Sequence, residues 1–196
     1  VSWDWALETF LHPDHGQALT LSQAVFEASL LPARGLACVP WCTQQNPFTP
    51  GVLGGGSYLG LSAHSSREDL LRAAAAGLAF EFARVFERPV AAGGVDAIVL
   101  GGGASKGVFF RRLFTALFSP LPVMTLADGD LAGTRGTLYA FRPALATSAA
   151  LPVETMPADA CARVADQYAD YRAAFERLYG HVESGKRYEL SGSGTN

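Results

Sequence analysis

The segment from Val95 to Phe118 constrains the fold of this chain more than any other part of the sequence. Val95–Leu100 is a run of strand length that is apolar except for Asp96, Gly101–Gly107 is a glycine-rich turn, and residues 108–118 are amphipathic at helical spacing. A second apolar run at 121–126 and a helix of small residues at 133–141 follow. This order of strand, turn, helix, strand and helix predicts an α/β layer in which the two strands pair in parallel.

Further elements are expected on both sides of this unit. Residues 1–34 have mostly helical spacing, with a break near Pro13 and Gly16. Gly35–Trp41 is predicted to be a short buried strand, and residues 43–60 are predicted to be a long loop.

Two long helices complete the expected secondary structure. The first is capped by Ser65 or Ser66, with Glu68 or Asp69 three residues on as in a capping box, and ends near Arg88-Pro89. The second runs from Ala158 to about Gly180. Its apolar stripe is predicted to pack in the core, and consists of Val164, Tyr168, Tyr171, Phe175 and Leu178.

Composition excludes several classes of protein. Apolar residues make up 49% of the 196 residues, which is enough for one sizeable hydrophobic core and excludes a disordered chain. The net charge of −3 provides no attraction to nucleic acid or to an anionic membrane. No run reaches the ~18 apolar residues of a spanning helix. Charged residues are only 17%, against roughly 25% in an ordinary domain, which raises the question of what covers the surface.

The cysteines indicate a reducing compartment. The chain has three cysteines, Cys38, Cys42 and Cys161. This odd number argues against a disulfide framework and favours the cytoplasm. They are interpreted as buried structural thiols, and the alternative is a metal site formed by the first two with His64.

The glycine-rich turn is the candidate binding site. Glycine lets a backbone approach a ligand without a Cβ clash, and backbone N–H groups at the start of a helix favour anions. Lys106, one of two lysines in the chain, adds a positive charge there. The residues alone leave two interpretations open, which are a nucleotide or phosphate site and a tight turn between a packed strand and helix.

The turn fails both common nucleotide motifs. Gly102 and Gly107 have the spacing of a Walker A loop, but Val108 and Phe109 stand where the lysine and hydroxyl residue belong. Gly101 and Gly103 fit a dinucleotide fingerprint, but Lys106 stands at the third glycine.

The sequence resembles the C-terminal domain of the FGGY carbohydrate kinases, which include xylulokinase, gluconokinase and glycerol kinase. Ordered segments over about residues 30–180 carry the resemblance. These are the apolar run to Pro40-Trp41, Ser57–Ser62 with the helix Asp69–Phe80, Ile98–Ala104, Arg135–Leu138 and a closing helix with Tyr168, Tyr171 and Tyr179.

The resemblance implies an actin-like, ribonuclease-H-like ATPase domain, α/β with a mixed sheet flanked by helices, over residues 1–187, with a flexible tail at 188–196. It implies ATP and Mg²⁺ as cofactors, a small sugar as substrate and an N-terminal lobe that is not part of this chain. The nucleotide would contact Gly101, Gly102, Gly103, Ala104, Lys106 and Gly107, and Gly136 would let the last helix pack close to the same site. The general-base aspartate is expected upstream, so no catalytic residue or metal ligand is assigned here.

Departures from the family pattern leave alternatives. Thr43–Asn46 and Lys106-Gly107 differ from the usual residues and favour, as an alternative, a non-catalytic sugar- or nucleotide-sensing member of the same fold. A nicotinamide-binding oxidoreductase is a minor alternative. The low charge predicts an apolar patch larger than roughly 600 Å² that faces the other lobe, the cleft or a second subunit of a homodimer.

Overall fold

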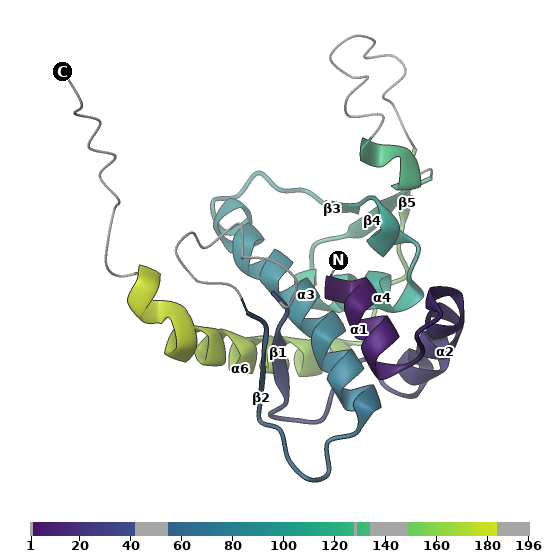
Figure 1. Cartoon of the computed structure of the whole chain (residues 1–196). Coiled ribbons are helices and arrows are strands. Elements are labelled where there is room, and N and C mark those ends of the chain that lie inside the picture. Colours follow the sequence, from purple (N-terminus) through teal and green to yellow (C-terminus); the bar gives the residue numbers. More distant parts are fainter. Residues whose placement is uncertain (1, 42–54, 128, 134–148, 184–196) are drawn as a thin grey trace, which may run out of the picture.

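The computed structural model describes residues 2–41, 55–127, 129–133 and 149–183 of the chain (Figure 1). The described helices are α1 (Ser2–Phe10), α2 (His15–Ala28), α3 (Arg67–Ala91), α4 (Val108–Phe118) and α6 (Ala158–Glu183), with two 3₁₀ turns, η1 (Gly103–Ser105) and η2 (Gly129–Leu131). The strands are β1 (Ala37–Val39), β2 (Ser57–Leu59), β3 (Ile98–Leu100), β4 (Val123–Leu126) and β5 (Ala150–Pro152).

The strand–turn–helix–strand unit forms as predicted from the sequence. β3 and β4 pair in parallel with Ile98 opposite Val123, and α4 connects them. β5 adds to the other side of β4 in the antiparallel direction, with Leu151 opposite Thr125. The sheet is therefore mixed, and its order is β3-β4-β5.

A separate hairpin corrects the predicted loop at 43–60. β1 pairs with β2 in the antiparallel direction, with Cys38 opposite Tyr58, so the end of that segment is a strand. Gly60 follows β2 with a φ of +73°. It lies so close to the backbone of Gly35 that a Cβ on Gly60 would be 2.0 Å from the Gly35 carbonyl oxygen. The strand forms through this long-range pairing, which local sequence does not reveal.

Helix α3 is the centre of the fold and contacts α1, α2, α4, α6 and β1 (Figure 1). Its N-cap is Ser66, which makes a reciprocal capping box with Asp69. The alanine run Ala73–Ala76 is buried, and a Cβ on the following Gly77 would lie 2.0 Å from the carbonyl oxygen of Cys38. Small side chains thus let the helix lie almost against the backbone of β1.

Two helix boundaries lie within a few residues of the predicted positions. Helix α3 passes Pro89 and ends at Ala91, because a proline in the last turn removes one hydrogen bond without ending the helix at once. The first break is at residues 11–14, and Gly16 lies inside α2, whose N-cap is Asp14.

Helix α6 packs its predicted stripe onto α3 and α4. Val164, Tyr171 and Phe175 are buried, while Tyr168 and Leu178 are half-buried. Of the cysteines, Cys38 is buried as expected and Cys161 is only partly covered.

Several predicted features lie outside the described residues. They are Cys42, the loop Thr43–Asn46, nearly all of the helix at 133–141 with Gly136, and the tail 188–196. Among the residues that are described, no helix is long and apolar enough to cross a membrane.

Candidate functional site

The glycine-rich turn carries the chain from the end of β3 into α4. Gly102 has a φ of +73°, a left-handed conformation that only glycine adopts readily. Its N–H donates a 2.6 Å hydrogen bond to the carbonyl oxygen of Gly129 in η2, and the Ser105 hydroxyl donates a 2.7 Å hydrogen bond to the carbonyl oxygen of Gly102. The first bond holds the turn against the loop that follows β4, and the second lies within the turn itself.

The three consecutive glycines have different surroundings. A Cβ on Gly101 would lie 3.1 Å from the Cβ of Ala132, so this exposed glycine lets the turn lie close to the residues that follow η2. A Cβ on Gly102 or on Gly103 would meet no atom within 4 Å. Gly102 and Gly103 therefore present bare backbone to open space, which is the property that a backbone cradle for a ligand needs.

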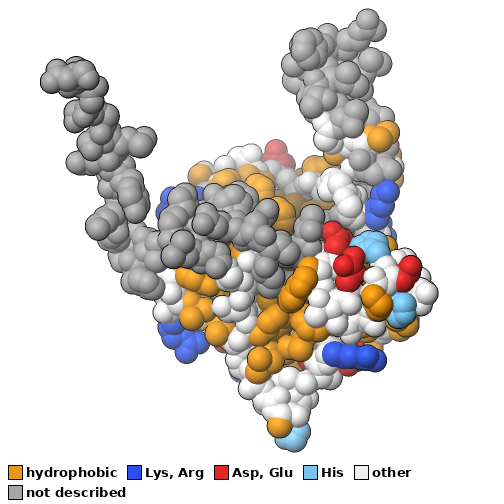
Figure 2. Space-filling model, viewed as in Figure 1, with side chains coloured by type: hydrophobic (Ala, Val, Ile, Leu, Met, Phe, Trp, Pro, Cys, Tyr) orange, Lys and Arg blue, Asp and Glu red, His pale blue; other side chains and the backbone are white. Residues whose placement is uncertain are grey.

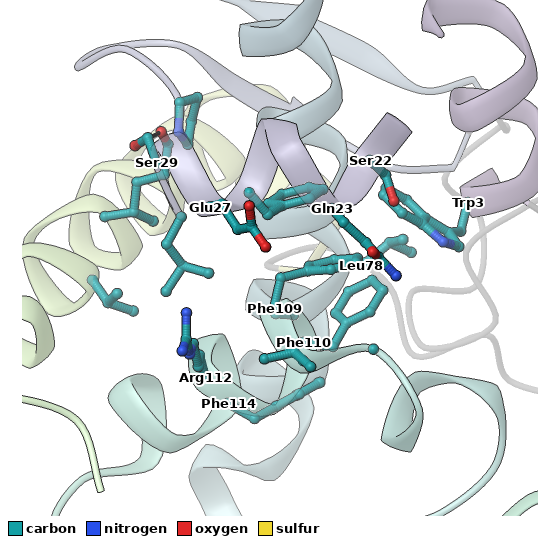
Figure 3. Close-up of a pocket in the computed structure, with 18 of the residues that line it drawn as sticks. Trp3, Ser22, Gln23, Glu27, Ser29, Leu78, Phe109, Phe110, Arg112 and Phe114 are labelled. Carbon is teal, nitrogen blue, oxygen red and sulfur yellow. Dashed lines mark hydrogen bonds between the residues drawn. The ribbon is translucent and has the colours of Figure 1, made fainter. Parts of the chain in front are cut away.

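The turn opens into a cavity of about 1500 Å³ between α2, α4 and α6 (Figure 3). Gly103, Lys106 and Gly107 line it at the start of α4. Trp3 from α1 and Phe26 from α2 line it as well. One cavity thus joins the predicted turn to residues that lie about a hundred positions earlier in the chain.

Aromatic rings form one wall of this cavity. Phe26 of α2 and Phe109 of α4 are stacked with ring centroids 3.9 Å apart and planes at 6°. The Trp3 indole contacts Phe109 and Phe110 at 5.3 and 5.4 Å between centroids. Phe26 and Phe110 are buried, so the partly exposed Trp3 and Phe109 are the rings of this wall that a planar group could contact.

Charged side chains surround the rest of the cavity. Lys106 lies at the turn, Glu27 on α2 and Arg112 on α4, and Figure 3 shows the last two on opposite sides of the space. Gly107, the N-cap of α4, contributes no side-chain hydrogen bond to the first turn of that helix. The positive end of the α4 dipole and the charge of Lys106 therefore act at the same end of the cavity, and both favour an anion.

The site residues that were predicted from the sequence differ in where they lie relative to the cavity. Gly103, Lys106 and Gly107 line the cavity, Gly102 adjoins it, and Gly101 lies close to Ala132. Ala104 lies in η1, and Gly136 is outside the described residues. Sequence reasoning missed Trp3, Asp4 and the α2 residues, because no local pattern links them to a turn so distant in the chain.

No metal-binding group comes together in the part of the chain that the structure describes. Nowhere in it do three or more His, Cys, Asp or Glu side chains lie in an arrangement that could hold an ion. We therefore assign no metal ligand to these residues.

Comparison with known proteins gives a fold but no sequence relative. No protein-family model and no curated protein matches the sequence. Among solved structures, the chain is similar to a xylulose kinase from Rhodospirillum rubrum, with a TM-score of 0.68 and 20% identity over 93% of this chain. It is similar to a gluconate kinase from Lactobacillus acidophilus at a TM-score of 0.70 and 19% identity, and to a ligand-bound xylulose kinase from Lactobacillus acidophilus at 0.63 and 19%.

These similarities confirm the resemblance to sugar kinases at the level of the fold. The chain spans only 38–39% of the length of the three kinases, while 93% of its own length is matched. It therefore has the fold of a part of such a kinase.

Proposed function

We propose that residues 1–187 are the C-terminal, nucleotide-side domain of an FGGY-type carbohydrate kinase with an actin-like ATPase fold, and that 188–196 are a tail. The intact enzyme transfers the γ-phosphoryl group of ATP to a hydroxyl of a small sugar, with a pentulose such as xylulose as the best candidate. The observation that carries this proposal is the bare backbone of Gly102 and Gly103 beside the α4 N-terminus. The fold shared with sugar kinases supports it.

The residues present fit a nucleotide. Its phosphates would lie near Lys106 and the first turn of α4, where a cation and a helix dipole favour negative charge. Its nucleoside would lie along the backbone of Gly102, Gly103 and Ala104, where no Cβ on either glycine would meet protein. The aromatic wall that contains Trp3 and Phe109 provides an apolar surface for the base in the same cavity. Gly136 is proposed to lie close to this site.

The chemical role of this chain would be binding and orientation. ATP with its Mg²⁺ supplies the phosphoryl group when bound, and the polypeptide here supplies backbone N–H groups and one lysine that position the phosphates. The sugar and the aspartate that accepts its hydroxyl proton belong to the lobe that precedes this segment. We therefore expect the 196 residues alone to phosphorylate no sugar.

The test is nucleotide binding by the full-length protein and its Gly103→Val variant, measured by calorimetry. The valine side chain points into open space, so we expect the melting temperature to stay within about 2 °C while ATP binding is lost. Gly16→Ala, in the first turn of α2, is the control, because Gly16 does not line the cavity, and this variant should bind ATP like the parent. Equal ATP affinity in Gly103→Val and the parent would refute the site.

A non-catalytic sensor of the same fold is the second candidate. Lys106-Gly107 stands at a position where kinases of this family usually carry Ser or Asn, and this departure favours it. Such a protein would bind ATP or a sugar but would release no ADP in the presence of both. A competition experiment between ATP and NADH for the cavity distinguishes the kinase and the sensor from a nicotinamide-binding oxidoreductase. An oxidoreductase would bind NADH more tightly than ATP.

A further inference from the structure

The shape of the glycine-rich turn depends on the short 3₁₀ turn η1, which has few backbone hydrogen bonds of its own. The N–H of Ser105 donates a 3.2 Å hydrogen bond to the carbonyl oxygen of Gly102, and the N–H of Lys106 donates a 3.1 Å bond to that of Gly103. Hydrogen bonds of a 3₁₀ turn have poorer geometry than those of an α-helix, and glycine is the most flexible residue. The bare backbone at Gly102 and Gly103 therefore needs further contacts to keep one conformation.

The side chain of Ser105 provides one of these contacts. Ser105 is only 6% exposed, and its hydroxyl donates a 2.7 Å hydrogen bond to the same carbonyl oxygen of Gly102 that its N–H binds. Gly129 of η2 lies so close that a Cβ on it would be 2.7 Å from Oγ of Ser105. Because Gly129 also accepts the hydrogen bond from the N–H of Gly102, Ser105 lies where η1 meets η2.

Arg111, in the first turn of α4 that follows, provides a second contact. Its Nη1 donates a 3.2 Å hydrogen bond to the carbonyl oxygen of Ser105, six residues earlier in the chain. No backbone N–H among the described residues bonds this oxygen. The N–H of Arg111 donates a further 3.1 Å hydrogen bond to the carbonyl oxygen of Gly107. Arg111 therefore binds the residue before Lys106 and the residue after it.

Ser105 and Arg111 are not among the described residues that line the nucleotide cavity, whereas Lys106 is. The next residue along α4, Arg112, does line the cavity (Figure 3). Arg111 is half-buried, and its guanidinium is directed at the backbone of η1. The two side chains can thus affect a ligand only through the stretch of backbone that they hold.

We propose that Ser105 and Arg111 are positioning residues for the nucleotide. They hold the backbone from Gly102 to Lys106 in the conformation that binds the ligand before the ligand arrives. The inference rests on the proposed function, because it concerns the same site. A turn that is ordered in advance loses less conformational entropy on binding, and this raises the affinity. Both residues thus contribute to ATP binding without touching ATP.

A role of Arg111 in the global stability of the fold is the main alternative. The Arg111 side chain makes one hydrogen bond to a neutral carbonyl oxygen, and its guanidinium is only partly covered. Such a bond exchanges readily with water and adds little to the stability of the whole protein. Its effect is therefore local, on a turn that has few other bonds to order it.

Binding of ATP and of adenosine to the full-length protein and its Arg111→Met variant, measured by calorimetry, tests the proposal. We expect both affinities to fall by about 10-fold, because the turn binds the nucleoside as well as the phosphates. The melting temperature should change by less than about 3 °C. Arg111→Lys keeps a donor at this position and should recover most of the affinity for both ligands.

Amide hydrogen exchange of Lys106 in the full-length protein reports on the order of the turn without any activity measurement. Without nucleotide, we expect this amide to exchange at least about 5-fold faster in Arg111→Met than in the parent. With saturating ATP the two rates should become equal, while amides in the centre of α3 should exchange equally in both proteins throughout. Faster exchange over the whole protein would indicate a role in global stability and would overturn the proposal.

Arg177→Met is the matched control. Arg177 on α6 also donates to a backbone carbonyl oxygen, that of Ala173, and it does not line the nucleotide cavity, so this variant should bind ATP like the parent. Ser105→Ala should weaken binding as Arg111→Met does, and the double variant should lose less than the product of the two single losses, because both act on one turn.

Two further results would overturn the positioning role. Equal ATP affinity in the parent and Arg111→Met would do so, as would a loss for ATP with unchanged adenosine binding, which would mean direct contact with the phosphates. A parent that binds no ATP would instead refute the proposed function, so the two proposals fail in different measurements.

Discussion

The hydroxyl of Tyr171 donates a 2.7 Å hydrogen bond to Oε1 of Glu81, and this bond joins α6 to α3 in the interior of the protein. Arg84 binds the same carboxylate through Nε at 2.9 Å and Nη2 at 3.0 Å. The Arg84 guanidinium also lies 4.1 Å from the centre of the Phe175 ring. Glu81 is only 2% exposed, and donors that include the Tyr171 hydroxyl and the Arg84 guanidinium hold its charge in the interior.

Tyr171→Phe should lower the free energy of unfolding by about 1–3 kcal/mol, because it removes a donor from a buried carboxylate. Burial and the Glu81 carboxylate raise the pKa of Tyr171 well above its usual range, so the hydroxyl is a donor at neutral pH. Tyr168→Phe is the matched control, since its partner Glu87 is 37% exposed and the loss should be below about 1 kcal/mol. Urea denaturation measures both, and equal losses would contradict the buried network.

Ser66→Ala should lower the free energy of unfolding by about 1 kcal/mol at neutral pH. The reason is that the Ser66 hydroxyl caps α3 by accepting a 3.1 Å hydrogen bond from the N–H of Asp69. Ser65→Ala, one residue earlier, is the control and should cost less, since Ser65 bonds only the loop residue Ser62 through exposed groups. Equal costs for the two variants would mean that the cap is misassigned.

Stability should also fall in acid through Asp69. Burial alone would raise the pKa of Asp69, but hydrogen bonds from Ser66 and the charge of Arg72 outweigh it and lower that pKa below its ordinary 3.8. The ionised carboxylate therefore stabilises the fold above pH 3.8, and this contribution is lost as the pH falls through the lower folded-state pKa. Asp69→Asn should flatten the decline of the melting temperature below pH 4, and an unchanged slope would exclude this carboxylate as a cause.

Gly77→Ala should destabilise the protein by about 3 kcal/mol or more. The added Cβ would lie 2.0 Å from the backbone carbonyl oxygen of Cys38, and backbone cannot move aside as a flexible side chain can. Gly16→Ala is a matched change within α2, where the new Cβ would be 3.4 Å from the nearest side-chain atom. It should stabilise by up to about 1 kcal/mol through helix propensity. Thermal denaturation of both variants should give opposite signs, and the same sign in both would contradict the close approach of α3 to β1.

Lys106→Met should weaken ATP binding to the full-length protein by about 3- to 10-fold and leave adenosine binding unchanged. The reason is that Lys106 lies at the end of the cavity where the phosphates are proposed to bind, while adenosine has no phosphate. The difference should shrink at high salt, because the lysine is exposed and its charge is screened. A parallel loss of affinity for both ligands would place Lys106 at the nucleoside instead.

Local patterns in the sequence were sufficient for the central unit of the fold. The apolar run that ends at Leu100, the glycines after it and the stripe of α4 predicted a parallel β3–β4 pair, and the structure has it. The capping signal near Ser66 and the aromatic stripe of α6 were equally local, and both helices form. These elements are long or periodic enough for side-chain spacing to identify them.

Elements that depend on distant partners were missed. β2 consists of Ser57–Leu59 and β5 of Ala150–Pro152, and each is a strand only because β1 or β4 pairs with it. The candidate site likewise combines a part that local sequence predicted with a part that depends on distant residues. The glycine turn was found from its own composition, whereas Trp3 and Phe26 reach the cavity only through the packing of α1 and α2 against α4. No spacing within the sequence predicts that packing.

Sugar-dependent release of ADP from ATP tests the central claim most directly. It should be measured with D-xylulose and a panel of other small sugars and polyols, for the full-length protein, its Gly103→Val variant and the 196-residue chain alone. We predict ADP release that requires both a sugar and an intact Gly103 in the full-length protein, and none from the chain alone. Binding of ATP by the full-length protein without sugar-dependent ADP release for any acceptor, or phosphorylation of a sugar by the chain alone, would contradict the account.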